Sequence, residues 1–153
     1  MAAAALSLDN PIFRMYMGYA FLVIIKTIAM SFATVFFRIT LKVFLNQEDV
    51  ASFDPNKTNK GPQVHPTIER IRRCHQNDLE NVIPFVLMGL LYVASGPTTF
   101  AASLHFRIFT ASRFLHTYVY IFSIPQPTRV LVFHVGVFTT LSMAYTVFSQ
   151  VAF

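Results

Sequence analysis

The sequence has few charged residues and only one cysteine. Charged residues make up 12% of its 153 residues, whereas hydrophobic residues make up 54%. Soluble domains usually carry about 25% charged residues, so this composition favours an integral membrane protein over a soluble domain. Because Cys74 stands alone, an internal disulfide is excluded, and the cysteine content does not indicate an oxidising compartment.

The N-terminal residues lack the basic cluster and the length of a cleaved signal peptide, so we expect the first apolar stretch to remain as a membrane anchor. The chain contains four apolar stretches, including this first one. Each is near or above the roughly 20 residues that span a bilayer once polar helix extensions are counted. They predict a single all-α domain over residues 1–153, an integral membrane four-helix bundle with antiparallel neighbours. The expected helices cover about residues 11–44, 67–95, 98–123 and 128–152.

Positive charges are concentrated at the first connection between helices and its edges. They are Arg38, Lys42, Lys57, Lys60, Arg70, Arg72 and Arg73. The Gly96-Pro97 turn and the C-terminal tail carry no Lys or Arg, so the positive-inside rule predicts a cytoplasmic loop over about 45–66 and lumenal termini. The net charge of +5 then reflects topology, and no nucleic-acid partner is expected. We expect the loop to be solvated, with a turn at Asp54-Pro55-Asn56.

The helix predicted over 67–95 carries charged side chains into its apolar half with no turn signal between them. Spacings of three, four and seven residues place Arg73, Asn77 and Glu80 on one face of that helix. Counted from the lumenal ends of their helices, Glu80 and Arg113 lie at similar depths, about 24 and 22 Å. The pattern predicts a polar layer inside the bundle.

Two further arginines reach this layer from the first and fourth helices. Arg38 and Arg129 are both expected at the cytoplasmic interface. The predicted polar layer therefore has several arginines and one acidic residue, Glu80. Such a layer suits an anionic ligand that carries one amine. Glutathione offers two carboxylates for arginines, an ammonium for Glu80 and a thiol that a nearby cation could ionise. These properties alone do not separate glutathione from other anions.

Several sequence motifs of this chain resemble those of a known family, the membrane-associated proteins in eicosanoid and glutathione metabolism (MAPEG). The resemblance covers nearly the whole chain and is most specific in Glu69-Arg70 and in the string from Arg72 to Asn81. It implies a homotrimer in the endoplasmic reticulum membrane, with the second helix lining the trimer core. Glutathione is then expected between adjacent subunits near the cytoplasmic face. The mitochondrial outer membrane stays open as a second location.

Matching positions in the family imply the residues of the site. The expected glutathione-binding residues are Arg38, Arg72, Arg73, His75, Asn77, Glu80, Arg113, His116 and Tyr120. Arg129 is implied as the cation that stabilises the glutathione thiolate, and Tyr120 is a second catalytic candidate. Three of these have structural alternatives: Arg113 in an internal salt bridge to Glu80 or Asp78 of a neighbouring chain, His116 as a hydrogen-bond partner inside the bundle, and Tyr120 as a residue of the interfacial aromatic belt.

Other polar residues are expected to be structural. Lys26 is expected to pair with Asp78 or Glu80 across helices, because an isolated charge within an apolar helix is costly. His75 and Asp78 share a helix face, but no second cluster of ligands accompanies them. No metal site is therefore predicted.

The resemblance implies a membrane-bound glutathione transferase, with glutathione as co-substrate, that conjugates glutathione to hydrophobic electrophiles and reduces lipid hydroperoxides. Two alternatives are a glutathione-dependent prostaglandin E synthase and a non-catalytic lipid-binding membrane partner. The prostaglandin E synthase branch has an arginine, a serine and a tyrosine where this chain has Gln76, Val130 and Phe133, which favours the transferase. The intact set of site residues argues against a non-catalytic partner.

Overall fold

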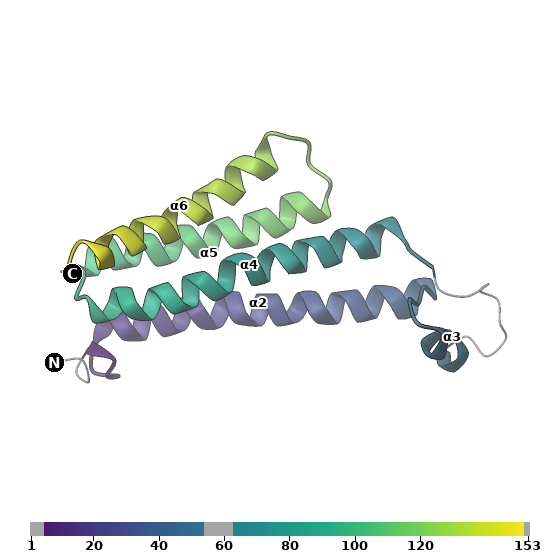
Figure 1. Ribbon diagram of the computed structural model, residues 1–153, viewed down its shortest axis with the longest axis horizontal. Coiled ribbons are helices and arrows are strands. Elements are labelled where there is room, and N and C mark those ends of the chain that lie inside the picture. Colours follow the sequence, from purple (N-terminus) through teal and green to yellow (C-terminus); the bar gives the residue numbers. More distant parts are fainter. Residues whose placement is uncertain (1–4, 54–62, 152–153) are drawn as a thin grey trace.

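Four long helices lie side by side in the structure, a computed structural model that describes residues 5–53 and 63–151 (Figure 1). They are α2 (Pro11–Leu41), α4 (Pro66–Ala94), α5 (Thr99–Ile121) and α6 (Thr128–Phe148), and a short helix, α3 (Gln47–Phe53), follows α2. Consecutive long helices run antiparallel, and the described residues contain no β-strand. The prediction of an all-α protein is confirmed over this part of the chain.

Side-chain caps explain where two of the long helices begin. The Oδ1 atom of Asn10 accepts a hydrogen bond from the Ile12 backbone N–H at 2.9 Å, and Pro11 fits the first turn of α2. At the start of α5, Thr98 Oγ1 accepts from the Ala101 N–H at 3.2 Å. These oxygens satisfy N–H groups that have no partner within the helix. The caps therefore define the helix ends opposite to α3.

The connection between α2 and α4 differs from the expected solvated loop. Helix α2 ends at Leu41 instead of near residue 44, because Lys42 adopts a left-handed conformation with φ of 52°. The chain then turns back, and Phe44 stacks on Phe53 of α3 with ring centroids 5.3 Å apart. Apolar contacts thus order a segment whose polar composition predicted a loop. The expected turn at residues 54–56 lies outside the described residues.

Aromatic side chains form the core between α2, α4 and α5. Phe85 of α4 stacks on Phe109 of α5 with ring centroids 3.7 Å apart, and both side chains are fully buried. Tyr16 of α2 donates its hydroxyl to the Val86 carbonyl of α4 at 2.7 Å. Buried aromatic rings contribute large apolar areas and favour specific ring geometries. The core therefore fixes three helices in the half of the molecule that lies away from α3.

A buried ion pair joins the middle of α2 to α4. The Nζ atom of Lys26 lies 2.5 Å from Asp78 Oδ1, and the two side chains are 7% and 0% exposed. The predicted pairing of Lys26 across helices is confirmed, with Asp78 as the partner. Because either charge alone would be costly in this interior, the pair ties the register of α2 to that of α4.

Two of the long helices, α2 and α6, are long and apolar enough to cross a membrane by length and composition. Helices α4 and α5 run alongside them in the bundle (Figure 1). Large apolar side chains remain exposed on the outer surface, among them Phe32, Phe100 and Phe138. Exposed apolar area of this extent is typical of a surface that faces lipid or another subunit. These features fit a helical membrane protein.

Candidate functional site

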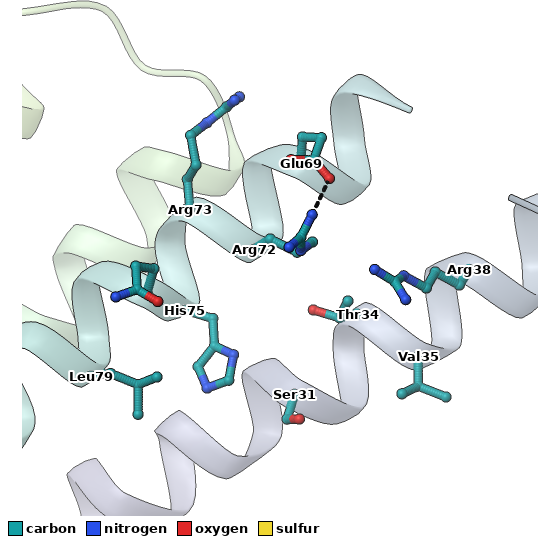
Figure 2. Close-up of a pocket in the computed structure, with 10 residues that line it drawn as sticks. Ser31, Thr34, Val35, Arg38, Glu69, Arg72, Arg73, His75 and Leu79 are labelled. Carbon is teal, nitrogen blue, oxygen red and sulfur yellow. Dashed lines mark hydrogen bonds and ion pairs between the residues drawn. The ribbon is translucent and has the colours of Figure 1, made fainter. Parts of the chain in front are cut away.

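The N-terminal half of α4 divides the expected site residues into two groups, one on each side of the helix. On the first side, a groove of about 540 Å³ separates α4 from α2. Figure 2 shows Arg38 of α2 and Arg72 of α4 extending into this groove, together with His75. Arg73 lines the edge of the groove and also the pocket on the other side of α4. Arg72 is held by Glu69, whose Oε1 lies 2.7 Å from the Arg72 Nη1 atom. The groove is therefore a basic site with one acid at its edge.

On the second side, two contiguous pockets lie between α4 and the α5–α6 end of the bundle. The first has a volume of about 350 Å³ and is lined by Arg70, Arg73, Tyr120 and Arg129, among others. The second, of about 330 Å³, adds Asn77 and shares Tyr120 and Arg129 with the first. Neither described lining includes an Asp or Glu. We call the two pockets together the Arg129 pocket.

Arg129 and Tyr120 are in direct contact. The guanidinium carbon of Arg129 lies over the Tyr120 ring, 4.8 Å from its centroid. A cation over an aromatic face is attracted by the ring quadrupole, by about 0.5–2 kcal/mol depending on exposure. Tyr120 lies in the last turn of α5 and Arg129 in the first turn of α6. The contact thus fixes a cation at the open end of the Arg129 pocket.

Arg113 and His116 are buried, with exposures of 0% and 2%, and Arg113 lies behind the pocket. Arg113 donates through Nη1 to Asn77 Oδ1 at 3.4 Å and through Nη2 to the Phe133 carbonyl at 3.1 Å, while its Nε has no hydrogen-bond partner among the described residues. His116 lines the Arg129 pocket. Its Nδ1 atom has no hydrogen-bond partner in the described part of the chain, so the expected bond within the bundle is not formed at that atom.

Glu80 lies apart from the other expected residues. Its side chain is exposed on α4 and accepts a hydrogen bond from Gln76 Nε2 at 3.2 Å. It lines neither the groove beside Arg38 nor the Arg129 pocket. Within one chain, the structure therefore brings Arg73, Asn77 and the residues of α5 and α6 together, but it does not bring Glu80 to them.

Several lining residues were not predicted from the sequence. Ser31 and Thr34 of α2 line the groove with Arg38, and Ser123 and Gln126 line the Arg129 pocket. The spacing of three and four residues from Ser31 through Thr34 to Arg38 repeats on one helix face, so periodicity could have found the first two. The other two belong to the α5–α6 connection, where no periodic pattern applies.

The hydrogen-bond donors that line the site determine which ligands it can bind. Arginines bind carboxylates through two parallel N–H···O bonds, and they keep their charge at all accessible pH values. The Arg129 pocket has arginines without a neighbouring carboxylate in its described lining, so an anion is the expected occupant. Beside Arg129, a thiol would be favoured as its thiolate, because a nearby positive charge stabilises the ionised form.

Comparison with known proteins agrees with the resemblance seen in the sequence. The chain matches the model of the MAPEG family over residues 16–149. It is 46% identical to microsomal glutathione S-transferase 1 of Homo sapiens over 139 residues, which cover 90% of each chain, and 47% identical to the protein of that name from Mus musculus over the same length and shares. Prostaglandin E synthase of Homo sapiens is 30% identical over 155 aligned residues, covering 99% of this chain and 98% of the relative. The chain belongs to the MAPEG family.

Proposed function

We propose that this protein is a membrane-bound glutathione transferase that joins glutathione to hydrophobic electrophiles. The observation that carries the proposal is the Arg129 pocket, a basic pocket whose described lining contains no Asp or Glu and whose Arg129 guanidinium lies over Tyr120. The relatives named microsomal glutathione S-transferase 1, at 44–47% identity over 90% or more of the chain, support the same activity. Glutathione is the co-substrate.

In the proposed reaction, arginines hold the glutathione carboxylates and Arg129 stabilises the sulfur as a thiolate. The thiol proton leaves to solvent. The thiolate then attacks an electrophilic carbon, a C–S bond forms, and the leaving group departs with the bonding electrons. With a lipid hydroperoxide, two glutathione molecules supply two electrons and two protons, which yields the alcohol, water and glutathione disulfide. Apolar substrates reach the site from the bilayer.

We further propose that the site is completed between subunits of a homotrimer. Arg38 faces the groove on one side of α4, whereas Arg129 faces the pocket on the other side. A single small ligand would contact both only if a neighbouring chain presented one of them. Glu80, exposed on α4, would bind the glutathione ammonium in the same assembly, with α4 lining the trimer core. His75 and Arg72 would then belong to the neighbour's side of the site.

The proposed location is the endoplasmic reticulum membrane, with four transmembrane helices, both termini in the lumen and the loop at about 45–66 in the cytosol. Arg38, Arg72 and Arg73 lie near the ends of α2 and α4 that flank this loop, in keeping with the positive-inside rule. Glutathione would then enter from the cytosolic side. The mitochondrial outer membrane is a second candidate location.

The test is conjugation of glutathione to chlorodinitrobenzene by the detergent-purified protein, with Arg129→Ala measured beside it. We expect activity in the wild type. We expect the Arg129→Ala variant still to bind immobilised glutathione. We expect its kcat to fall at least about tenfold, because removing one charge that stabilises a transition state typically costs that much or more. A folded wild-type protein without conjugating activity would refute the proposal.

A second candidate is glutathione-dependent isomerisation of prostaglandin H to prostaglandin E, because relatives named prostaglandin E synthase align with nearly the whole chain. Two of the three positions that distinguish that branch, Val130 and Phe133, line the Arg129 pocket. Product analysis with prostaglandin H as substrate separates the two activities. A lipid-binding partner without catalysis would fail both assays and would not be retained by immobilised glutathione.

A further inference from the structure

Arg113 connects three helices at the back of the Arg129 pocket. Its Nη1 donates to Asn77 of α4 at 3.4 Å, and its Nη2 donates to the Phe133 and Val132 carbonyls of α6 at 3.1 and 3.4 Å. The side chain is fully buried, and within the described residues it forms no ion pair. A planar guanidinium is suited to this task because its donors point in several fixed directions.

Gly136 makes room for this connection. A methyl group on Gly136 would lie 2.5 Å from Arg113 Nη2 and 2.9 Å from its Cζ, both closer than atoms in proteins normally approach. It would also lie 2.8 Å from Ser112 Oγ, which is itself fixed by donation to the Phe109 carbonyl at 2.7 Å. Because Arg113 is fully buried and Ser112 is 5% exposed, a methyl group at Gly136 would displace the guanidinium from its place against the α6 carbonyls.

The acceptors of Arg113 belong to the walls of the Arg129 pocket. Asn77 and Phe133 both line that pocket. Phe133 lies one helical turn after Arg129 on α6, so a hydrogen bond to its carbonyl constrains the turn that carries Arg129. Arg113 therefore sets the separation between Asn77 on α4 and Arg129 on α6 without reaching the ligand itself.

From this geometry we infer that Arg113 is a positioning residue for the reaction, which aligns Arg129 with the glutathione sulfur, and that Gly136 is the glycine that its guanidinium requires. The inference rests on the proposed glutathione chemistry. In this inference, Arg113 acts through Asn77 and α6 and does not contact the ligand. Positioning errors of about 1 Å cost on the order of a hundredfold in rate, so loss of the connection should be visible in kcat.

The matched substitutions are Gly136→Ala, Gly89→Ala and Gly18→Ala, which add the same methyl group at three helical glycines. At Gly89 the methyl would collide with the Tyr16 ring, far from Arg113 in the fold, and at Gly18 it would meet nothing within 4 Å. Gly89→Ala therefore measures the effect of a packing clash alone. Arg113→Lys is a further variant that keeps the charge but loses the fork of donors.

Three quantities are measured on each purified protein: the thiolate fraction of bound glutathione, kcat with KM for glutathione, and hydrogen exchange over residues 128–135. We expect Gly136→Ala and Arg113→Lys to lower kcat about tenfold or more at little-changed KM. We also expect them to lower the thiolate fraction and to speed exchange at the start of α6. Gly89→Ala should lower the melting temperature while these three quantities stay as in the wild type.

Wild-type values of all three quantities in Gly136→Ala or in Arg113→Lys would overturn the inference. So would equal changes in Gly136→Ala and Gly89→Ala, because they would indicate a general packing effect. If the wild type does not bind glutathione, the proposed function fails. In that case the hydrogen exchange of Gly136→Ala against Gly89→Ala still decides whether Arg113 holds α6.

Discussion

Lys26 and Asp78 form a buried ion pair between α2 and α4. Both are buried, and the Lys26 ammonium bonds one carboxylate oxygen of Asp78. Removing one partner of a buried pair leaves an uncompensated charge, which typically costs about 3–5 kcal/mol. Neither Lys26 nor Asp78 can therefore be replaced alone without leaving a buried charge that has lost its partner.

We predict that Lys26→Met lowers the free energy of unfolding by about 3–5 kcal/mol, and that Lys26→Met combined with Asp78→Asn recovers part of the loss. Thermal unfolding in detergent, followed by circular dichroism, measures both. A melting temperature of Lys26→Met equal to that of the wild type would show that Asp78 is stabilised by other groups.

At the residue scale, sequence reasoning succeeded where a lone charge in an apolar context demanded a partner. Lys26 was expected to pair with Asp78 or Glu80, and the pair with Asp78 is formed. The acceptors of Arg113 were not foreseeable, because they include backbone carbonyls of α6 and depend on how that helix packs. Hydrogen bonds to backbone carbonyls of another helix leave no signature in the sequence.

The contact between α2 and α4 depends on a small residue facing an aromatic ring. Gly89 of α4 lies against the Tyr16 ring of α2, which is 4% exposed, and the Tyr16 hydroxyl is fixed by the Val86 carbonyl. A methyl group at Gly89 would occupy the same space as the ring. The ring cannot move away without losing its hydrogen bond, so the two helices must shift.

We predict that Gly89→Ala destabilises the protein by about 1–3 kcal/mol, the usual cost of overpacking a filled core. Gly18→Ala is the control, since it adds the same methyl group to a helix in open space and should be neutral or stabilising by up to about 1 kcal/mol. Melting temperatures in the same detergent measure the difference. Equal values for the two variants would contradict the proposed clash.

At the element scale, the long helices follow from features that are local in sequence. Asn10 and Thr98 supply caps, and apolar runs continue from them. Helix α3 was not predicted, because it is short, polar, and ordered by the contact of Phe53 with Phe44 from another segment. The early end of α2 depends on the left-handed backbone of Lys42, a conformation that the residue type does not predict.

The whole molecule presents two basic sites on opposite sides of α4. The groove contains Arg38, and the pocket contains Arg129. A closed symmetric oligomer places the same two surfaces of neighbouring chains against each other in every interface. If glutathione binds at such an interface, each site takes Arg38 from one subunit and Arg129 from the next.

We predict that co-expression of Arg38→Ala and Arg129→Ala chains restores activity that neither variant has alone. With random mixing in a ring, roughly a quarter of the sites would combine two intact surfaces. Different affinity tags on the two chains select mixed oligomers, and conjugation activity per site is the measurement. Mixed oligomers no more active than either variant would place the complete site within one subunit.

At the scale of the molecule, composition indicated a membrane protein and the family strings indicated the MAPEG family, and both are confirmed. Distance along each helix places Arg113 and Glu80 in one layer, but it does not determine the direction in which each side chain points. In the structure Arg113 faces the interior, whereas Glu80 is exposed on α4.

The most direct measurement is titration of the purified wild-type protein with glutathione at neutral pH, following ultraviolet absorbance of the thiolate and release of protons. We expect saturable thiolate formation in the wild type. In Arg129→Ala we expect glutathione to bind without forming the thiolate, because the pKa of the bound thiol rises when the neighbouring cation is removed. Absence of thiolate in the wild type, or equal amounts in both proteins, would contradict the role of Arg129.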